Sequence, residues 1–355
     1  MFKKTMAFLL MFILAITFSV KSGAQTIYDY IQPFQSYINI DDKNGNHRGW
    51  AGYGHTGKTQ NFWSLRQWGN PSNLMPAAFP EGQPWEIANG NSRIKYYPLL
   101  NGAPNVYELA AAHVPCPTSG TATEANELDL FLEPKDYTPT RVYLSNMGQL
   151  QLNIGINFPY SNRTYNCAYN SSGIVASLIL LNTEYPYQVF FLQINLGGTD
   201  GLSNQIAWCP DYEGVVDASH LNWNYVNLFC ADDSVANYGN YSRLSAGSMR
   251  NFNLDVLPRI QQIIRNGHRK PLPFGTALNT NLKTWYLAGL YFGITNYGGT
   301  NIATQWWNPK IKASGGTFCA GTNRTQYICE LPVAPNAGWV NVGGGCYHRI
   351  SDVPC

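Results

Sequence analysis

Apolar and polar residues alternate along most of the chain after about residue 90, in runs separated by clusters of glycine, proline, asparagine and serine. Alternation with a period of two is typical of β-strands, whose successive side chains point to opposite faces. These runs are rich in β-branched and aromatic residues, which favour strands. The pattern therefore predicts a β protein, and the clearest runs are SRIKYYPLL, ELDLFLE, QLQLNIGINF, GIVASLILLN, YQVFFLQINLG and TWYLAGLYFGIT.

One segment, DVLPRIQQIIRNG, departs from this alternation. Its apolar residues Leu257, Ile260 and Ile264 recur at helical spacing, Asp255 is placed to act as the N-cap, and Gly267 lies at the exit. Many strands with one short helix predict an all-β fold, a β-sandwich or jelly roll, in which the helix covers an edge or an end.

Four of the predicted strands have one aliphatic face and one face of a different kind. The aliphatic side chains must pack inside, where each contributes about 1.5–3 kcal/mol on burial. The opposite faces carry amides, carboxylates, aromatic rings and glycine, but no lysine or arginine. Amides and carboxylates can hydrogen-bond neutral hydroxyl groups, and aromatic rings can stack on sugar rings. We therefore expect a concave sheet that binds a neutral glycan through Gln151, Asn153, Phe191, Gln193, Asn195, Trp285 and Tyr291.

The same composition also fits a second buried layer, because buried amides and carboxylates are normally hydrogen-bonded within the protein. In that case the chain is a structural or adhesion protein without a sugar site. A separate candidate is the adjacent pair Trp306 and Trp307. Neighbouring strand residues point to opposite sides, so one ring is expected in the core and the other is free to serve as a sugar platform.

Charge is scarce in this sequence. Charged residues make up 12% of the chain, against roughly 25% in average domains. Aromatic residues make up 14%, and the formal net charge is +2. Without a basic stripe, nucleic-acid binding has little support. A surface composed mainly of uncharged polar groups favours a carbohydrate or cell-surface glycan as the partner.

The N-terminus is typical of an export signal. Lys3 and Lys4 precede an apolar run over residues 6–20, and small residues follow at 22–24. This pattern predicts a signal peptide over residues 1–24. The run is short for a membrane helix, and no second run of spanning length follows. The mature chain is therefore expected to have no membrane span and to be secreted, extracellular or periplasmic.

Eight cysteines follow this predicted export signal, and an even number in that setting predicts disulfide bonds. They form no CxxC or Cys/His zinc pattern, so no metal site is expected from them. The last four fall in the glycine-rich residues 313–355, which predicts a small disulfide-rich appendage after a sandwich domain at 25–312. A strapped extension of the main domain is the alternative. The cysteines are Cys116, Cys167, Cys209, Cys230, Cys319, Cys329, Cys346 and Cys355.

The stretch GYGHTGKT, Gly52–Thr59, matches the spacing of a phosphate-binding loop. Such a loop requires a strand before it and a helix after it. The preceding DDKNGNHRGWA is polar and turn-like, and the following QNFWSLRQWGNPSN lacks a helical apolar stripe. A surface loop is therefore predicted, and no nucleotide is expected.

A weak calcium-loop pattern lies just upstream, where Asp42, Asn44 and Asn46 alternate around Gly45. The twelfth position of such a loop should be acidic, but Tyr53 occupies it. A tight turn at Asn44 and Gly45 is favoured. A structural calcium remains open, and no other cofactor is expected.

The two-faced strands and the late LKTWYLAGLYFGITNYGG are similar in style to the concanavalin A-like lectin/glucanase sandwiches. ELDLFLE resembles the acidic strand of family 16 glycoside hydrolases. That resemblance implies Glu127 as nucleophile, Asp129 as its electrostatic neighbour and Glu133 as acid/base. GLYFGITN resembles the late strand of family 12 glucanases that carries a catalytic glutamate, but here Thr295 takes the comparable place.

The spacing of these acids limits a catalytic role. Six strand residues at about 3.3 Å each separate Glu127 from Glu133 by about 20 Å, whereas retaining hydrolysis needs carboxyl groups about 5–5.5 Å apart. Glu127 or Asp129 would therefore need an acid from another strand, such as Glu108 or Glu184. A glycoside hydrolase with such a pair is the alternative to a glycan-binding protein. The acids could equally bond loops or hold calcium.

Overall fold

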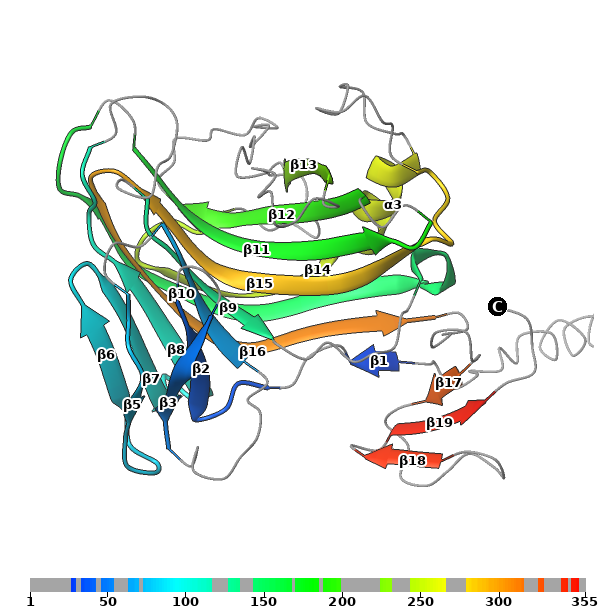
Figure 1. Ribbon diagram of the computed structural model, residues 1–355, viewed down its shortest axis with the longest axis horizontal. Coiled ribbons are helices and arrows are strands. Elements are labelled where there is room, and N and C mark those ends of the chain that lie inside the picture. The colour runs from blue at the N-terminus through cyan, green and yellow to red at the C-terminus, as the bar shows by residue number, and fades with distance from the viewer. Residues whose placement is uncertain are drawn as a thin grey trace, which may run out of the picture.

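Two β-sheets packed face to face form the main body of the protein (Figure 1). The predicted all-β sandwich is therefore confirmed. The structure is a computed structural model, and it describes residues 27–29, 33–42, 46–53, 63–69, 73–116, 127–134, 143–167, 170–184, 188–198, 224–231, 243–265, 279–315, 325–328, 340–343 and 346–350.

The first sheet has seven strands in the order β14-β10-β16-β8-β7-β6, with β1 also paired to β16. Its strands are β1 (Ile27–Asp29), β6 (Trp85–Asn89), β7 (Ser92–Leu100), β8 (Ala103–Ala111), β10 (Gln149–Arg163), β14 (Ser248–Asp255) and β16 (Thr300–Ser314).

The second sheet has nine strands in the order β13-β12-β11-β15-β9-β4-β2-β3-β5. They are β2 (Tyr37–Asp41), β3 (His47–Gly52), β4 (Trp63–Trp68), β5 (Ala77–Ala78), β9 (Asp129–Pro134), β11 (Ser171–Asn182), β12 (Gln188–Gly198), β13 (Asn224–Ala231) and β15 (Trp285–Tyr297).

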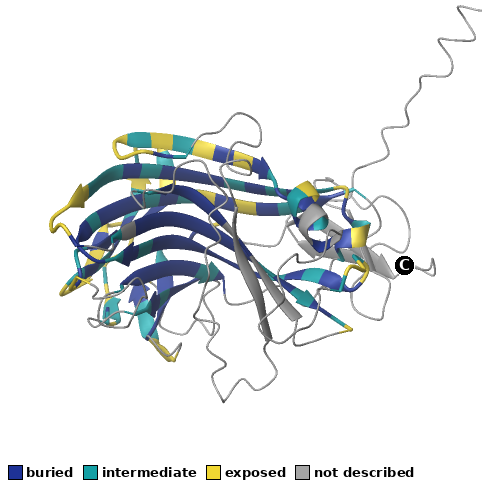
Figure 2. Ribbon diagram, turned by 90° about the horizontal axis from the view of Figure 1, so that it is seen from above, coloured by how far each residue is buried: buried dark blue, intermediate teal, exposed yellow. Residues whose placement is uncertain are grey.

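The aliphatic strand faces meet between the two sheets, as the alternation predicts. Leu152 and Ile154 of β10 are buried there, together with Leu130 of β9. Across the interface, Phe292 of β15 stacks on Trp306 of β16 with ring centroids 6.2 Å apart. Figure 2 shows that buried positions dominate the curved strands, while exposed positions gather at strand ends and turns. This packing leaves each sheet one outer face.

The predicted helix is confirmed as α3 (Leu257–Arg265), the only α-helix among the described ranges. A short 3₁₀ turn, η1 (Leu144–Asn146), accompanies it. Ile260 and Ile264 of α3 are buried. The Asp255 carboxylate accepts hydrogen bonds from the amides of Leu257 and Leu150, each at 3.2 Å. Asp255 therefore caps α3 from two residues before its first residue, one position earlier than an N-cap. The same carboxylate also connects α3 to β10.

Replacing Asp255 with alanine is expected to lower the free energy of unfolding by about 1–2 kcal/mol, because two partly buried amides lose their acceptor. Asp255→Asn keeps an acceptor oxygen at the same place and should retain most of the stability. Chemical denaturation of the three proteins measures the difference. Equal stability of Asp255→Ala and wild type would show that these bonds contribute nothing.

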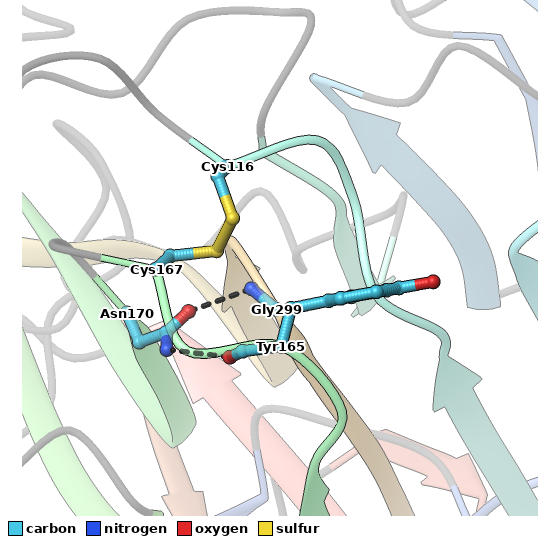
Figure 3. The surroundings of a disulfide bond; sticks show 5 residues. All are labelled: Cys116, Tyr165, Cys167, Asn170 and Gly299. Carbon is cyan, nitrogen blue, oxygen red and sulfur yellow. Dashed lines mark hydrogen bonds between the residues drawn. A yellow bond between two sulfur atoms is a disulfide. The ribbon is translucent and has the colours of Figure 1, made fainter.

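One of the predicted disulfides is present in the described ranges, where Cys116 is bonded to Cys167 (Figure 3). It joins the segment after β8 to the segment after β10. Beside it, Asn170 accepts a hydrogen bond from the amide of Gly299 at 2.6 Å and donates one to the carbonyl of Tyr165 at 3.3 Å. The disulfide and the Asn170 side chain together hold three segments at one end of the sandwich, namely those that follow β8 and β10 and the turn between β15 and β16. The side chains of Cys209, Cys230, Cys319, Cys329, Cys346 and Cys355 lie outside the described part.

The predicted C-terminal appendage contains a separate three-stranded sheet in the order β17-β19-β18. Its strands are β17 (Thr325–Ile328), β18 (Val340–Gly343) and β19 (Cys346–Ile350). The domain boundary at 312 remains a prediction. The predicted signal peptide, residues 1–24, lies outside the described residues. Over the described ranges, no helix has the length and apolar character needed to cross a membrane.

The segment before the phosphate-loop match is not the polar turn that the sequence predicts. Residues 47–52 form β3, which pairs antiparallel with β2. Pairing with β2 makes this polar segment a strand despite its composition. Asp42 has the contacts of a tight turn: its carboxylate accepts from the amide of Asn46 at 2.8 Å and pairs with Arg48. Asn44, Gly45 and residues 54–60 lie outside the described ranges.

Candidate functional site

The predicted ligand-binding residues lie on the outer faces of two different sheets. Gln151 and Asn153 belong to β10, which pairs with β14 and β16 in the seven-stranded sheet. Asn195 and Tyr291 belong to β12 and β15 of the nine-stranded sheet. The expectation of one shared face is therefore wrong, because the two strand groups lie on opposite sides of the sandwich.

Trp285 belongs to neither outer face. Its side chain is fully buried in the core, and its indole N–H donates to the carbonyl of Asn279 at 2.7 Å. The cause is a register shift between β11 and β15, where Leu180 pairs with Leu287 and Ile179 pairs with Gly289. The extra residue in β15 reverses the alternation, so Trp285 and Tyr291 point to opposite sides.

The outer face of the nine-stranded sheet carries an aromatic cluster that is largely closed. Phe131 lies 4.9 Å from Trp68 and 4.8 Å from Tyr291 between ring centroids. Phe131 is 3% exposed and Tyr291 is 8% exposed. Asn195 accepts from Arg243 at 3.0 Å. These contacts match the buried second layer that the sequence left open. The side chains of Phe191 and Gln193 lie outside the described part.

This face also carries a cation, contrary to expectation. Arg66 of β4 pairs with Glu133 through Nε and lies 3.4 Å from the Asp41 carboxylate through Nη1. Burial, the largest single influence, lowers the pKa of Arg66, but Glu133 and then Asp41 outweigh it and raise the pKa overall. Glu133 is therefore held by an ion pair. The sequence pattern does not predict Arg66, because the faces without lysine or arginine belong to four other strands and not to β4.

The predicted catalytic acids do not form a pair with either proposed partner. Glu108 lies on β8, in the other sheet. Leu130 of β9 pairs with Ile294, which pairs with Ile174 of β11. Glu184 is ten residues beyond Ile174, about 30 Å along the strand direction, and therefore too far from Glu127 or Asp129. Asp129 instead accepts from the amide of Asn296 at 3.3 Å. No group of three His, Cys, Asp or Glu in the described part could hold a metal ion.

A pocket of about 490 Å³ lies on the outer face of the seven-stranded sheet. Its described lining contains one indole and five amide side chains, and no charged side chain. Leu100 of β7, Ala103 and Pro104 of β8 and Met249 of β14 supply an apolar wall. The polar lining consists of Asn101, Asn157, Asn251, Gln305, Asn308 and Trp307.

Trp307 lies across the strands at this pocket, directly over Gly155. The two residues are register partners in β16 and β10, and a Cβ built at Gly155 would lie 2.0 Å from Cε2 of the indole. The indole N–H donates to the Asn251 side chain of β14 at 3.1 Å. Only glycine leaves room for the ring here. Trp306 is fully buried, so the expected division between one core and one outward tryptophan is confirmed.

A local irregularity in β16 follows Trp307. Asn308 has φ 50°, a left-handed value that asparagine tolerates better than most residues. The register with β10 shifts at this point, between Asn153 and Gly155. Pro309, which has no N–H to donate, follows at the bulge, where proline is tolerated in a strand. The sequence Trp-Trp-Asn-Pro is the signal that could have located this feature.

A row of hydrogen bonds crosses four strands beside the pocket. Asn157 Nδ2 donates to Gln305 Oε1 at 2.8 Å, and Gln305 Nε2 donates to Glu108 Oε2 at 2.7 Å. Arg93 Nη2 donates to Glu108 Oε1 at 2.6 Å, and the Tyr97 hydroxyl donates to Oε2 at 3.3 Å. Burial, and then Glu108, raise the pKa of Tyr97, so its hydroxyl remains a donor at neutral pH. Glu108, expected as a partner acid, instead anchors this row.

Most of this site is not predictable from the sequence alone. Among its residues, the sequence indicates only Trp307, as one of the two adjacent tryptophans considered for a sugar platform. Asn251 and Gln305 were not singled out, although β14 and β16 also alternate between polar and apolar residues. Alternation shows that a strand has a polar face, but it does not show which polar faces become neighbours.

The chain matches no known family model and no curated protein. Several solved structures are similar to it. Endoglucanase 3 of Trichoderma harzianum, from family GH12, has a TM-score of 0.33 and 10% identity over 73% of this chain and 100% of that chain. A cellulase derived from Cel12A of Rhodothermus marinus gives 0.34 and 8% over 70% and 100%. The xyloglucanase domain of NopAA from Sinorhizobium fredii, solved with cellobiose, gives 0.29 and 7% over 64% and 97%.

The first two are an endoglucanase of family GH12 and a cellulase, enzymes of the kind that the sequence resembles. At such low TM-scores and identities, they carry no argument about the site. The case for function therefore depends on the pocket itself.

Proposed function

We propose that the protein binds a neutral saccharide in the pocket lined by Trp307. The observation that carries this proposal is the indole lying over Gly155, surrounded by amide side chains and no charged side chain. A sugar ring has C–H faces that pack on an aromatic ring and hydroxyl groups that exchange hydrogen bonds with amides. The pocket therefore offers both kinds of contact at one place.

The size and wall of the pocket support a small polar ligand with some apolar surface. A volume of about 490 Å³ lies within the range of about 300–1,000 Å³ that holds small molecules. Leu100, Pro104 and Met249 give the apolar contacts of such sites. The charge-poor composition and the export signal predicted at residues 1–24 fit an exported protein whose partner is a carbohydrate or a cell-surface glycan.

We propose binding without cleavage. No acidic side chain is among the described residues that line the pocket, whereas glycoside hydrolysis uses a pair of carboxyl groups. The acids of β9 lie in the other sheet, and Glu133 is paired with Arg66. The saccharide is therefore held and released unchanged.

A glycan array tests this proposal with wild type, Trp307→Ala and Trp68→Ala. Trp68 is a matched control because it is a half-buried tryptophan on the outer face of the other sheet. Wild type and Trp68→Ala should bind the same uncharged glycans without releasing reducing ends, and Trp307→Ala should not bind them. Loss of binding in Trp68→Ala alone would place the site on the nine-stranded sheet and reject the proposal.

A further inference from the structure

The buried carboxylate of Glu108 lies next to the pocket without lining it. It is 6% exposed and receives hydrogen bonds from Arg93, Tyr97 and Gln305. An ionised carboxylate only accepts hydrogen bonds. Gln305 must therefore turn its NH₂ group toward Glu108, and this fixes which end of the amide faces the next strand.

The orientation of Gln305 fixes that of Asn157 in turn. The Gln305 carbonyl oxygen now faces Asn157 and can only accept, so Asn157 must turn its NH₂ group toward it. The carbonyl oxygen of Asn157, a residue that lines the pocket, is left at the end of the row. The buried carboxylate of Glu108 acts on Asn157 through Gln305. It thereby determines that Asn157 offers a hydrogen-bond acceptor to a ligand.

Asn251 is oriented by a separate contact. An indole N–H only donates, so the Asn251 oxygen must face Trp307 and its NH₂ group is left for other partners. The pocket consequently has an acceptor from Asn157 on β10, the strand that carries Gly155, and a donor from Asn251 on the neighbouring strand β14.

We propose that Glu108 is a positioning residue that fixes the hydrogen-bond polarity of the pocket, so that the pocket selects a saccharide with a free hydroxyl donating to Asn157. This inference rests on the proposed function, since it assigns the ligand class of the same pocket. A ligand that cannot donate leaves the Asn157 oxygen without a hydrogen-bond partner in the complex. This costs about 1–3 kcal/mol of binding free energy, which lowers the affinity about 5- to 150-fold.

Monofluorinated sugars test the inference, because fluorine replaces a hydroxyl at similar size but cannot donate. The probes are methyl β-glucoside and methyl β-galactoside, each with its set of monofluorinated derivatives, titrated by ligand-observed NMR. In wild type, one position should lose at least about fivefold in affinity on fluorination. In Glu108→Gln, the penalty at that position should fall below about threefold, because a glutamine can also donate and lets Gln305 and Asn157 turn over.

Two further variants complete the design. Glu86→Gln is the matched control: Glu86 is an acid on β6 paired with Lys95 and is not part of the row, so it should keep the wild-type penalty. Gln305→Met breaks the row beside the pocket and should lower the penalty as Glu108→Gln does, which covers the case in which Glu108→Gln fails to fold.

An unchanged fluorination penalty in folded Glu108→Gln or Gln305→Met overturns the inference. If Trp307→Ala still abolishes binding of the parent glycosides in that case, the proposed saccharide site stands and only the role of Glu108 is rejected. If neither parent glycoside binds wild type, or binding does not depend on Trp307, the proposed function fails and this inference fails with it.

Discussion

Trp307→Ala is expected to weaken saccharide binding about 30-fold or more while leaving the fold intact. Trp307 is half-buried and lies on the outer face of the sheet, so its removal leaves the core unchanged. Its indole is the only aromatic ring among the described lining of the pocket. Truncating a central tryptophan in a binding site typically costs at least about 2 kcal/mol, and each 1.4 kcal/mol is tenfold in affinity. Calorimetric titration with the glycan found on the array measures the loss.

Trp307→Phe separates the ring from its hydrogen bond. Phenylalanine keeps an aromatic face over Gly155 but cannot donate to Asn251. Its affinity should fall between wild type and Trp307→Ala. Affinity equal to wild type in Trp307→Ala would mean that the indole contacts no ligand.

Gly155→Ala is expected to weaken saccharide binding as much as Trp307→Ala does, although the indole itself is still present. The added methyl carbon would lie 2.0 Å from Cε2 and 2.1 Å from Nε1 of Trp307, far inside contact distance. The ring must therefore leave its position and lose its bond to Asn251. Overpacking of this kind also costs about 1–3 kcal/mol of stability. Binding titrations and chemical denaturation measure the two effects.

The double variant Gly155→Ala/Trp307→Ala provides the control. Both changes remove the same platform, so the combined loss of affinity should equal either single loss rather than their sum. Stability should partly recover in the double variant, because the new methyl group no longer meets a ring. Additive losses of affinity would show that Gly155 and Trp307 act separately, contrary to the geometry.

Local pattern was sufficient for much of the fold. The alternation of Leu152, Ile154 and Ile156 identified the buried face of β10, and the spacing of Ile260 and Ile264 identified α3. Both signals arise within one element, from the period of its own side chains. The bond between Cys116 and Cys167 was expected from the number of cysteines, although its pairing was not.

The candidate site depended on contacts that no local pattern contains. β10 and β12 have the same kind of polar face, yet pairing across the chain places them in opposite sheets. A single extra residue in β15 turns Trp285 into the core. Glu108 is an acid by sequence, but its neighbours Arg93 and Gln305 make it an anchor. Sheet order, bulges and side-chain partners are long-range properties, so the sequence suggested the chemistry of the site and not its place.

The most direct test of the Trp307 pocket is the indole N–H resonance of Trp307 in a nitrogen–proton NMR spectrum, assigned by its absence from the spectrum of Trp307→Ala. Titration with a neutral glycan that binds should shift this resonance progressively, with the same saturation as binding, while the indole resonance of Trp68 stays in place. Saturable glycan binding that leaves the Trp307 resonance unmoved would contradict a sugar site at this pocket.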